Sequence, residues 1–466
     1  MAAELGWRDL LVGGNAARLL VVTGGVALHA VSIYVVATIM PTVVGDLGGL
    51  AFFAWTTTLY VTGALTGAAA VPLILARGSP RVAYRIGFLV FMLGSLGCAA
   101  APSMGVLLLG RLAQGFGGGM LPALAYSTVR SIFPSALHAR AITLFGSIWG
   151  IAALIGPSVG GLFAQFGTWR GAFATDLVIG LVFLAVAEQV LPRLIEGAPA
   201  RGQFPGVRLV TLAAAAIALS IGGLSGMARD ALIGIAIASS FVVGVLWMDG
   251  LASERLLPKG AFNPGVPLGA VSATIGLLIL STSAGVFVPF LLHAGQGASP
   301  IVAGYSTALV ALTWTGASFV SATTDRKWIR RYIAIGAPLM LAGIVVDGIS
   351  FANASFAGVL FGQALIGAGI GLGWAQLGAL MMEVAPVESR AIAGPFITTT
   401  QTLASVFGSA IVGMVANLAG LPTAITPTAV ATSAAILFAA IAIFPLVGAL
   451  TSWQVLRLTR HRSVSV

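Results

Sequence analysis

Apolar segments about 20 residues long recur along almost the whole chain, separated by short turns. A run of about 20 apolar residues is long enough to cross a bilayer as a helix. The chain is 58% hydrophobic and only 8% charged, whereas a soluble domain carries about 25% charged residues. The sequence therefore predicts an all-α integral membrane protein with fourteen transmembrane helices, at approximately residues 17–41, 52–76, 83–103, 105–128, 141–165, 171–191, 207–228, 231–249, 267–293, 300–322, 332–350, 355–382, 391–419 and 427–455.

The net charge of +10 could indicate a nucleic-acid partner, but the positions of the basic residues point to membrane topology. With the N-terminus in the cytoplasm, twenty of the 23 Lys and Arg residues fall on the cytoplasmic side. Arg170 and Arg229 fall outside, and Arg111 lies within a span. This distribution obeys the positive-inside rule, so we expect both termini in the cytoplasm and no nucleic-acid binding. An Ala- and Gly-rich composition with more Arg than Lys suggests a bacterial inner membrane protein.

An internal repeat relates the two ends of the chain. Gly110, Gly115, Gly117 and Gly119 each have a glycine counterpart 252 positions later. Parallel repeats of this kind are one architecture of secondary transporters. We therefore expect two pseudo-symmetric six-helix bundles, at residues 1–195 and 259–466, joined by a linker with two additional transmembrane helices at 196–258.

Two motifs, one in the predicted fourth helix and one in the predicted fifth, resemble those of a known family. The predicted fourth helix contains Arg111-x-x-Gln114-Gly115, and the fifth contains a glycine and proline motif. These resemble the R-x-x-Q-G and G-P-x-x-G-G motifs of the major facilitator superfamily, and in particular its fourteen-helix drug:proton antiporter branch. The resemblance implies alternating access between two bundles and proton-driven export of amphipathic or aromatic small molecules. The residues that match the antiporter motif are Gly150, Gly156, Pro157, Gly160 and Gly161.

Charged residues inside spans are the candidates for proton coupling. Arg111 is costly in lipid unless it is paired, hydrated or able to reach the headgroups, and the resemblance implies a role for it in coupling. Asp176 and Asp347 also lie within predicted spans, and burial favours the proton-bound form of a carboxyl group. Each of these acids could instead be a hydrated or helix-capping residue.

The first predicted helix departs from the antiporter pattern. This branch usually carries an acidic residue nine positions before the proline of that helix, where this chain has Ser32. His29 lies one turn earlier and could carry the proton instead, since histidine titrates near neutral pH. A histidine held neutral by hydrogen bonds within the bundle is the alternative. The loop after the second helix also departs, so the predicted cytoplasmic gate consists of Arg77, Asp325 and Arg326.

Aromatic and polar residues within the spans are candidates for a substrate cavity, because sites for apolar ligands combine aromatic walls with a few polar groups. They are Ser32, Tyr34, Trp55, Tyr60, Gln114, Trp149, Trp314, Gln363 and Trp374. We expect a small-molecule substrate, protons and the lipid bilayer as partners and a monomeric protein, with an accessory partner left open.

Other function classes lack sequence support. The chain has no phosphate-binding G-x-x-x-x-G-K-[ST] motif. Its four histidines have no metal-ligand spacing, so we expect no metal, no cofactor and no enzyme activity. Two alternatives to the drug:proton antiporter stay open. One is a transporter of another substrate class, such as a lipid, siderophore or metabolite, with or without proton coupling; the more distant one is a non-transporting membrane receptor.

Overall fold

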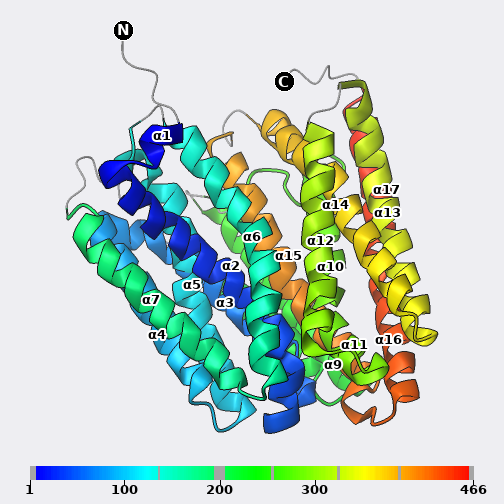
Figure 1. Ribbon diagram of the computed structural model, residues 1–466. Coiled ribbons are helices and arrows are strands. Elements are labelled where there is room, and N and C mark those ends of the chain that lie inside the picture. The colour runs from blue at the N-terminus through cyan, green and yellow to red at the C-terminus, as the bar shows by residue number, and fades with distance from the viewer. Residues whose placement is uncertain are drawn as a thin grey trace. The chain divides into compact units, whose positions relative to one another are not determined.

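The computed structural model describes residues 7–134, 137–193, 205–252, 255, 257–322, 326–386 and 390–460. All regular elements in these residues are helices (Figure 1). Eleven of the helices are long and apolar enough to cross a membrane. Together with the less apolar helices α5 and α12 and the shorter α8, they correspond to the fourteen predicted spans. The all-α membrane fold predicted from the sequence is therefore confirmed.

The helices group into two compact units. Unit 1 comprises residues 1–48 and 59–210, and unit 2 comprises residues 49–58 and 211–466. The boundary in the middle of the chain falls inside α8. The predicted division at 1–195, 196–258 and 259–466 stays a prediction.

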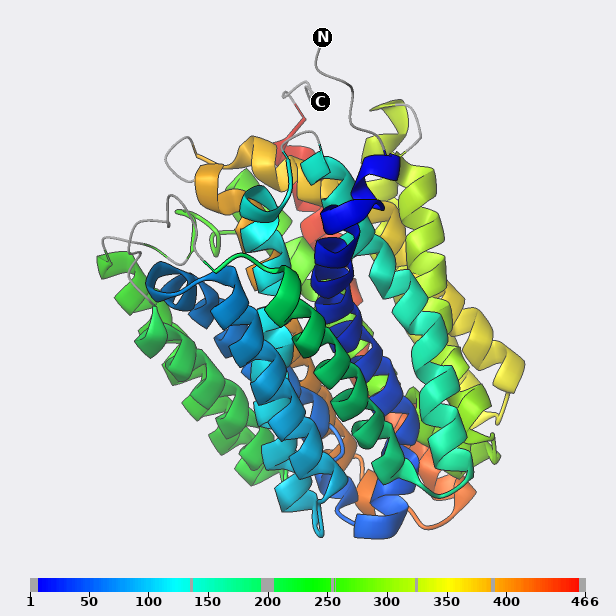
Figure 2. The ribbon, with the colours of Figure 1, turned by 60° about the vertical axis from the view of Figure 1, so that its left-hand side comes forward.

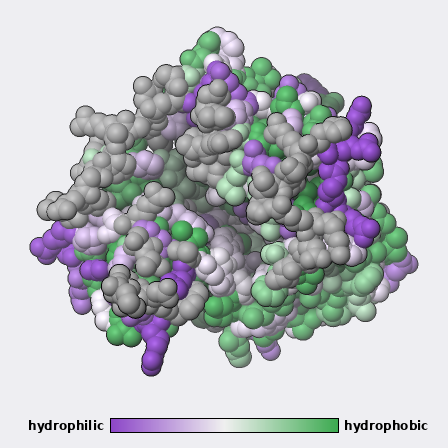
Figure 3. All heavy atoms as spheres, turned by 90° about the horizontal axis from the view of Figure 1, so that it is seen from above, coloured by the Kyte–Doolittle hydropathy of each residue, from purple (hydrophilic) through white to green (hydrophobic). Residues whose placement is uncertain are grey.

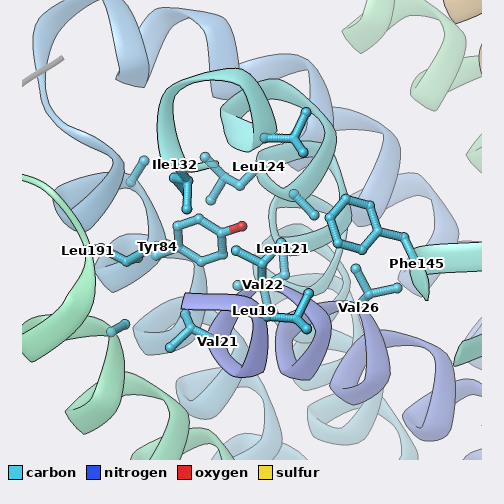
Figure 4. Packing of buried hydrophobic residues seen from close by; sticks show 14 of the residues in the cluster. Leu19, Val21, Val22, Val26, Tyr84, Leu121, Leu124, Ile132, Phe145 and Leu191 are labelled. Carbon is cyan, nitrogen blue, oxygen red and sulfur yellow. The ribbon is translucent and has the colours of Figure 1, made fainter. Parts of the chain in front are cut away.

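Unit 1 is a bundle in which α7 lies beside both α2 and α4 (Figures 1 and 2). Buried side chains from α2, α4, α5 and α6 interlock in its interior, as Figure 4 shows around Tyr84 and Leu121. Van der Waals packing of this kind holds helices together in lipid, where apolar burial gives little driving force. The helices of unit 1 are α1 (Trp7–Leu10), α2 (Gly13–Leu47), α3 (Trp55–Arg77), α4 (Pro80–Ala99), α5 (Met104–Ile132), α6 (His138–Gln165) and α7 (Trp169–Val190). The part of α3 before Leu59 belongs to unit 2.

Unit 2 contains the second bundle and the additional helix pair. Gly222 of α8 and Gly234 of α9 lie close together, and buried residues of both helices form one cluster with Ala410 and Met414 of α15. The elements of unit 2 are η1 (Leu50–Phe52), α8 (Gly206–Gly222), α9 (Ala228–Leu251), α10 (Pro267–Thr282), η3 (Ser283–Val286), α11 (Val288–Gln296), α12 (Pro300–Ala322), α13 (Arg326–Ala352), α14 (Phe356–Val384), α15 (Arg390–Leu418), η5 (Leu421–Thr423), α16 (Pro427–Ile441) and α17 (Ile443–Leu458). The part of α8 before Thr211 belongs to unit 1.

Two predicted spans are interrupted. The span at 267–293 is formed by α10, η3 and α11, and the span at 427–455 is formed by α16 and α17. Pro289 and Pro445 stand near the start of the second helix in each case. Proline lacks a backbone N–H and clashes with the preceding turn, so it favours a helix start. Proline does not always break a helix here, because Pro157 lies within the continuous α6.

The repeat appears in the contacts as well as in the sequence. An added Cβ at Gly117 of α5 would meet the backbone of Gly87 and Phe91 in α4. At Gly369 of α14 it would meet Gly336 and Met340 of α13, which stand 249 positions after Gly87 and Phe91. Two arginines that stand 249 positions apart make equivalent contacts. Arg81 donates to the Leu191 carbonyl at the end of α7, and Arg330 donates to the Leu456 carbonyl in α17. The two units therefore repeat one helix-packing pattern, as the predicted pseudo-symmetry requires.

Ion pairs join helix ends within unit 1. Arg85 of α4 forms a bidentate pair with Glu188 of α7, with N–O distances of 2.5 and 2.6 Å. Asp46, at the end of α2, accepts hydrogen bonds from the Trp169 indole and the Arg170 guanidinium at the start of α7. Both pairs lie at helix ends.

Hydrophobic side chains cover much of the outer surface, as expected of helices that face lipid. In the view along the helices, green hydrophobic residues form much of the visible edge (Figure 3). Large exposed apolar side chains include Leu93, Leu109, Leu181, Trp247 and Phe319.

Candidate functional site

A buried carboxylate in unit 1 lies in a network of polar side chains from several helices. Asp176 of α7 is 5% exposed. Its Oδ2 accepts hydrogen bonds from Ser32 Oγ of α2 at 3.3 Å and from Gln114 Nε2 of α5 at 2.9 Å. The same Gln114 amide nitrogen donates to Ser95 Oγ of α4 at 2.8 Å. Asp176 and Gln114 thus connect polar side chains from four helices.

Arg111 supplies the positive charge of this cluster. It is 2% exposed, and its Nη1 donates to Oε1 of Gln114. Its guanidinium carbon lies 4.0 Å from the centre of the Tyr60 ring, a cation–π contact that is stronger where water is excluded. Gln114 therefore bridges two opposite charges, with its oxygen toward Arg111 and its nitrogen toward Asp176.

His29 joins the cluster through Tyr60. Its Nδ1 lies 2.8 Å from the Tyr60 hydroxyl, and the two rings stack with their centres 5.4 Å apart. The indole of Trp149, which is 40% exposed, meets the imidazole edge-on at 5.9 Å. An added Cβ at Gly118 would lie 3.0 Å from His29 Nδ1 and 2.9 Å from the Tyr60 hydroxyl oxygen. Glycine at position 118 therefore leaves space for the contact between His29 and Tyr60.

Helix periodicity explains how the sequence builds this cluster. His29 and Ser32 are three residues apart on α2, and Arg111 and Gln114 are three apart on α5, so each pair shares one helix face. Glycine lets the neighbouring backbones approach: a Cβ at Gly115 would overlap the Tyr60 carbonyl of α3. We refer to His29, Ser32, Tyr60, Ser95, Arg111, Gln114 and Asp176 as the Asp176 cluster.

In unit 2, α13 carries a buried carboxylate with fewer hydrogen-bond partners than Asp176. Asp347 of α13 is 0% exposed, and its Oδ2 accepts a hydrogen bond from Gln363 Nε2 of α14 at 2.6 Å. Oδ1 of Asp347 and Oε1 of Gln363 are buried without a hydrogen-bond partner. Gln363 stands 252 positions after Arg111, so the repeat has a neutral amide where unit 1 has a guanidinium.

The other predicted site residues fall into separate groups. Trp314 of α12 and Trp374 of α14 meet edge-on at 5.2 Å in unit 2, and Trp55 meets Phe52 at 5.8 Å in the same unit. Tyr34 is half-buried on α2. Of the predicted cytoplasmic gate, Asp325 and the side chains of Arg77 and Arg326 lie outside the described residues. The roles of all these residues stay predictions.

Sequence reasoning missed Ser95. It is a fully buried serine on α4 that donates to the Phe91 carbonyl and accepts from Gln114. A lone serine in an apolar helix gives no signal of its own, and only the packing of α4 on α5 assigns it a partner.

Glycines of the antiporter motif contact α2, which belongs to the same unit. An added Cβ at Gly156 would overlap Tyr34 of α2, and one at Gly160 would lie 2.7 Å from the Val35 carbonyl oxygen of α2. Pro157 and Gly161 are buried beside them. Gly150 has nothing within 4 Å of its ideal Cβ position. Gly156 and Gly160 therefore let α6 approach α2, while the predicted seam between the two bundles stays a prediction.

This difference predicts effects of different size for two alanine substitutions in one helix. Gly160→Ala should lower the free energy of unfolding by about 1–3 kcal/mol, because overpacking forces the backbones apart. Gly150→Ala should change it by less than about 0.5 kcal/mol, since open space receives the methyl group. Thermal unfolding of the two detergent-purified variants measures the difference. Equal stability of the two variants would contradict the close approach of α6 and α2.

Among the described residues, no group of three or more His, Cys, Asp or Glu side chains could hold a metal ion. Cys98 is a free, buried thiol.

Comparison with known proteins identifies the family. The sequence model of the Major Facilitator Superfamily matches residues 22–408. A probable multidrug-efflux transporter of Mycobacterium tuberculosis is 33% identical over 432 residues, which cover 90% of this chain and 91% of that protein. The multidrug transporter protein MdtP of Bacillus subtilis is 26% identical, over 87% of this chain and 76% of its own length.

Solved structures show the same fold. A D-xylose-proton symporter superposes with a TM-score of 0.65 at 17% identity, over 95% of this chain and 98% of its own. The POT family transporter PepTSo superposes with a TM-score of 0.67 at 16% identity, over 96% of this chain and 99% of its own. The family match and the similarity to transporters rather than enzymes agree with the helix motifs and the repeated bundle. This chain belongs to the major facilitator superfamily of membrane transporters.

Proposed function

We propose that the protein is a proton-coupled antiporter that exports amphipathic or aromatic small molecules by alternating access. The Asp176 cluster is the observation that carries the proposal. An ionisable group buried in a membrane span is costly and is usually functional. Asp176 can exchange a proton, and Arg111 compensates its charge when the proton is absent.

The position of Asp176 accounts for the missing acid on the first span. Antiporters of the resembling branch carry a carboxylate where this chain has Ser32. Here the Ser32 hydroxyl donates to Asp176, so α7 supplies a carboxylate 3.3 Å from the Ser32 side chain. We infer that Asp176 takes over the coupling role of the absent residue.

Gln114 and His29 have supporting roles in this proposal. Gln114 holds Arg111 and Asp176 at a fixed separation, with its oxygen and nitrogen on opposite charges. His29 lies on the far side of Tyr60 and contacts the partly exposed Trp149. The Tyr60 ring in turn packs on Arg111, so His29 and Tyr60 form the side of the cluster next to Trp149. Asp347, with only an amide as hydrogen-bond partner, is the second candidate for proton exchange.

The substrate class is inferred from aromatic side chains and from the relatives. Trp149 in unit 1 and the Trp314 and Trp374 pair in unit 2 offer ring surfaces that suit planar apolar compounds. The names of the relatives, a multidrug-efflux transporter and a multidrug transporter, support the same class. The proposed setting is a bacterial inner membrane, with both termini in the cytoplasm and one chain as the working unit.

One observation favours a second candidate function. A carboxylate on the first span would suit a cationic substrate, and this chain has Ser32 there. A transporter of a neutral or anionic lipid, siderophore or metabolite, with or without proton coupling, is therefore the alternative.

Flux in reconstituted proteoliposomes tests the proposal. Cationic, neutral and anionic dyes are supplied with and without an imposed pH gradient, and a protonophore serves as control. We expect dye movement that follows the gradient and stops with the protonophore. Dye movement that ignores the gradient would favour the uncoupled alternative. A complete lack of flux across the panel would contradict multidrug export.

A further inference from the structure

A carboxyl group and an amide join two helices of unit 2 away from water. Asp347 of α13 is 0% exposed, and Gln363 of α14 is 1% exposed. Gln363 Nε2 donates to Asp347 Oδ2 at 2.6 Å. In the described part of the chain, Asp347 Oδ1 and Gln363 Oε1 have no hydrogen-bond partner, although both atoms are buried.

The two unpaired oxygens are both acceptors when Asp347 is ionised. A carboxylate has no hydrogen to donate, and an amide oxygen only accepts. Buried polar atoms are almost always hydrogen-bonded. A proton on Asp347 Oδ1 supplies the missing donor, because the acid O–H can donate to Gln363 Oε1 while Nε2 donates to Oδ2. Turning the amide over would bring its oxygen against Oδ2, where two acceptors 2.6 Å apart again need a proton between them.

The charged residues of α13 are far from Asp347. The nearest in the sequence is Arg331, sixteen positions earlier, which is about 24 Å along a helix. Tyr332, the only other ionisable side chain between them, is a phenol and is uncharged at neutral pH. The helix that carries Asp347 therefore supplies no positive charge to balance an ionised carboxylate.

The helices that pack on α13 place no described charge near Asp347 either. α10 and α16 have no ionisable side chain, and α12 has only the phenol of Tyr305. Glu383 of α14 stands twenty positions after the paired amide, about 30 Å along a helix. Arg457 is in the last turn of α17, which receives a hydrogen bond from the start of α13. It therefore lies at the opposite end of α13 from Asp347.

The internal repeat shows how unit 2 differs from unit 1 at this place. Asp347 stands 249 positions after Cys98, the offset that relates α4 to α13. The contacts agree, because an added Cβ at Gly110 would meet the Cys98 sulfur and one at Gly362 would meet Asp347 Oδ1. Unit 1 thus has a thiol and a guanidinium where unit 2 has an acid and an amide. The exchange puts an acid in unit 2 without the cation that unit 1 has.

We propose that Asp347 carries a resident proton and forms with Gln363 a cyclic acid–amide clamp between α13 and α14. The acid O–H at Oδ1 donates to Oε1 and Nε2 donates to Oδ2, so the pair is neutral and each of its oxygens is bonded. Hydrogen bonds between helices of this kind support their association in lipid. In the proposed function, a clamp that keeps its proton leaves Asp176 as the acid that exchanges one. That consequence rests on the proposed function, whereas the proton on Asp347 does not.

Infrared spectroscopy of the detergent-purified protein tests for the proton directly. A protonated carboxyl group and a carboxylate absorb in separate bands. At neutral pH, Asp347→Asn should remove the protonated-carboxyl absorption of one group and leave the carboxylate absorption unchanged. Loss of carboxylate absorption without loss of protonated-carboxyl absorption would overturn the proposal.

Asp46 provides a matched control for the same substitution. It lies at the end of α2 and accepts hydrogen bonds from Trp169 and Arg170, contacts that favour the ionised form. Asp46→Asn should therefore remove carboxylate absorption and leave the protonated-carboxyl band as it is in the wild-type protein.

Thermal unfolding provides a second measurement. Asparagine at position 347 can replace the acid O–H with an amide N–H, so Asp347→Asn should unfold at nearly the wild-type temperature. Asp347→Leu leaves both polar atoms of Gln363 unpaired and should unfold several degrees lower. If both variants unfold at a higher temperature than the wild-type protein, each has removed an uncompensated buried charge, and the proposal is overturned. Neither measurement involves transport, so a failed flux assay would contradict the proposed function and leave the clamp standing.

Discussion

Asp176→Asn should strongly reduce gradient-driven export while leaving the protein folded. Asparagine has nearly the same shape as aspartate and can still accept from Ser32 and Gln114, but it cannot exchange a proton. Gradient-driven dye flux should fall by about tenfold or more, because an intramembrane carboxylate carries the coupling. The measurement is the proteoliposome assay with an imposed pH gradient. Asp230→Asn, at the start of α9 and outside both carboxylate sites, serves as control and should transport normally.

Moving the carboxylate provides a sharper form of this prediction. Because Ser32 Oγ lies 3.3 Å from Asp176 Oδ2, Ser32→Asp combined with Asp176→Ser exchanges acid and hydroxyl across one contact. The exchanged protein should regain part of the gradient-driven flux that Asp176→Ser alone loses. Recovery would show that the place of the carboxylate matters more than the helix that carries it.

Two outcomes would contradict this assignment. Normal gradient-driven flux in Asp176→Asn would exclude Asp176 as the coupling residue. Loss of coupling in Asp347→Asn with normal coupling in Asp176→Asn would move the site to the α13 and α14 pair. Thermal unfolding separates either result from a folding defect.

The fold could be predicted from the sequence because its signals are local and repeated. Apolar length marks each span, and glycines at a constant offset mark the two bundles. The interruptions of the spans at 267–293 and 427–455 could not be predicted in the same way. Pro289 starts a new helix and Pro157 stays inside one, although both stand in apolar runs. Neighbouring helices decide between these outcomes, and a single span does not contain that information.

Most members of the Asp176 cluster stand out in the sequence, but Ser95 and the contacts between the members do not. Arg111, Gln114 and Asp176 stand out because charged and amide groups are rare in a span. Nothing in the sequence pairs α7 with α2, so the contact that places Asp176 beside Ser32 comes from packing alone. The sequence likewise does not show that residues 49–58 belong to unit 2. Their assignment to unit 2 depends on contacts with residues more than 200 positions away, such as Phe53 with Phe287.

Arg111→Met should destabilise the protein more than any other single change in the cluster. Methionine keeps an apolar chain of similar length, but it leaves the buried Asp176 without its positive neighbour. Removing one partner from a set of buried charges typically costs about 3–5 kcal/mol. We expect a loss of this size in the free energy of unfolding, measured by denaturant titration in detergent, together with loss of gradient-driven flux.

A double substitution distinguishes lost charge balance from lost packing. In Arg111→Met combined with Asp176→Asn, no buried charge remains uncompensated, so about 1–3 kcal/mol of the lost stability should return. Transport should stay absent, because the carboxyl group is gone. Arg111 also packs on the Tyr60 ring at 4.0 Å, and that contact is lost in both variants. If the double variant is as unstable as Arg111→Met alone, packing on Tyr60 rather than charge balance with Asp176 explains why a guanidinium is buried in this span.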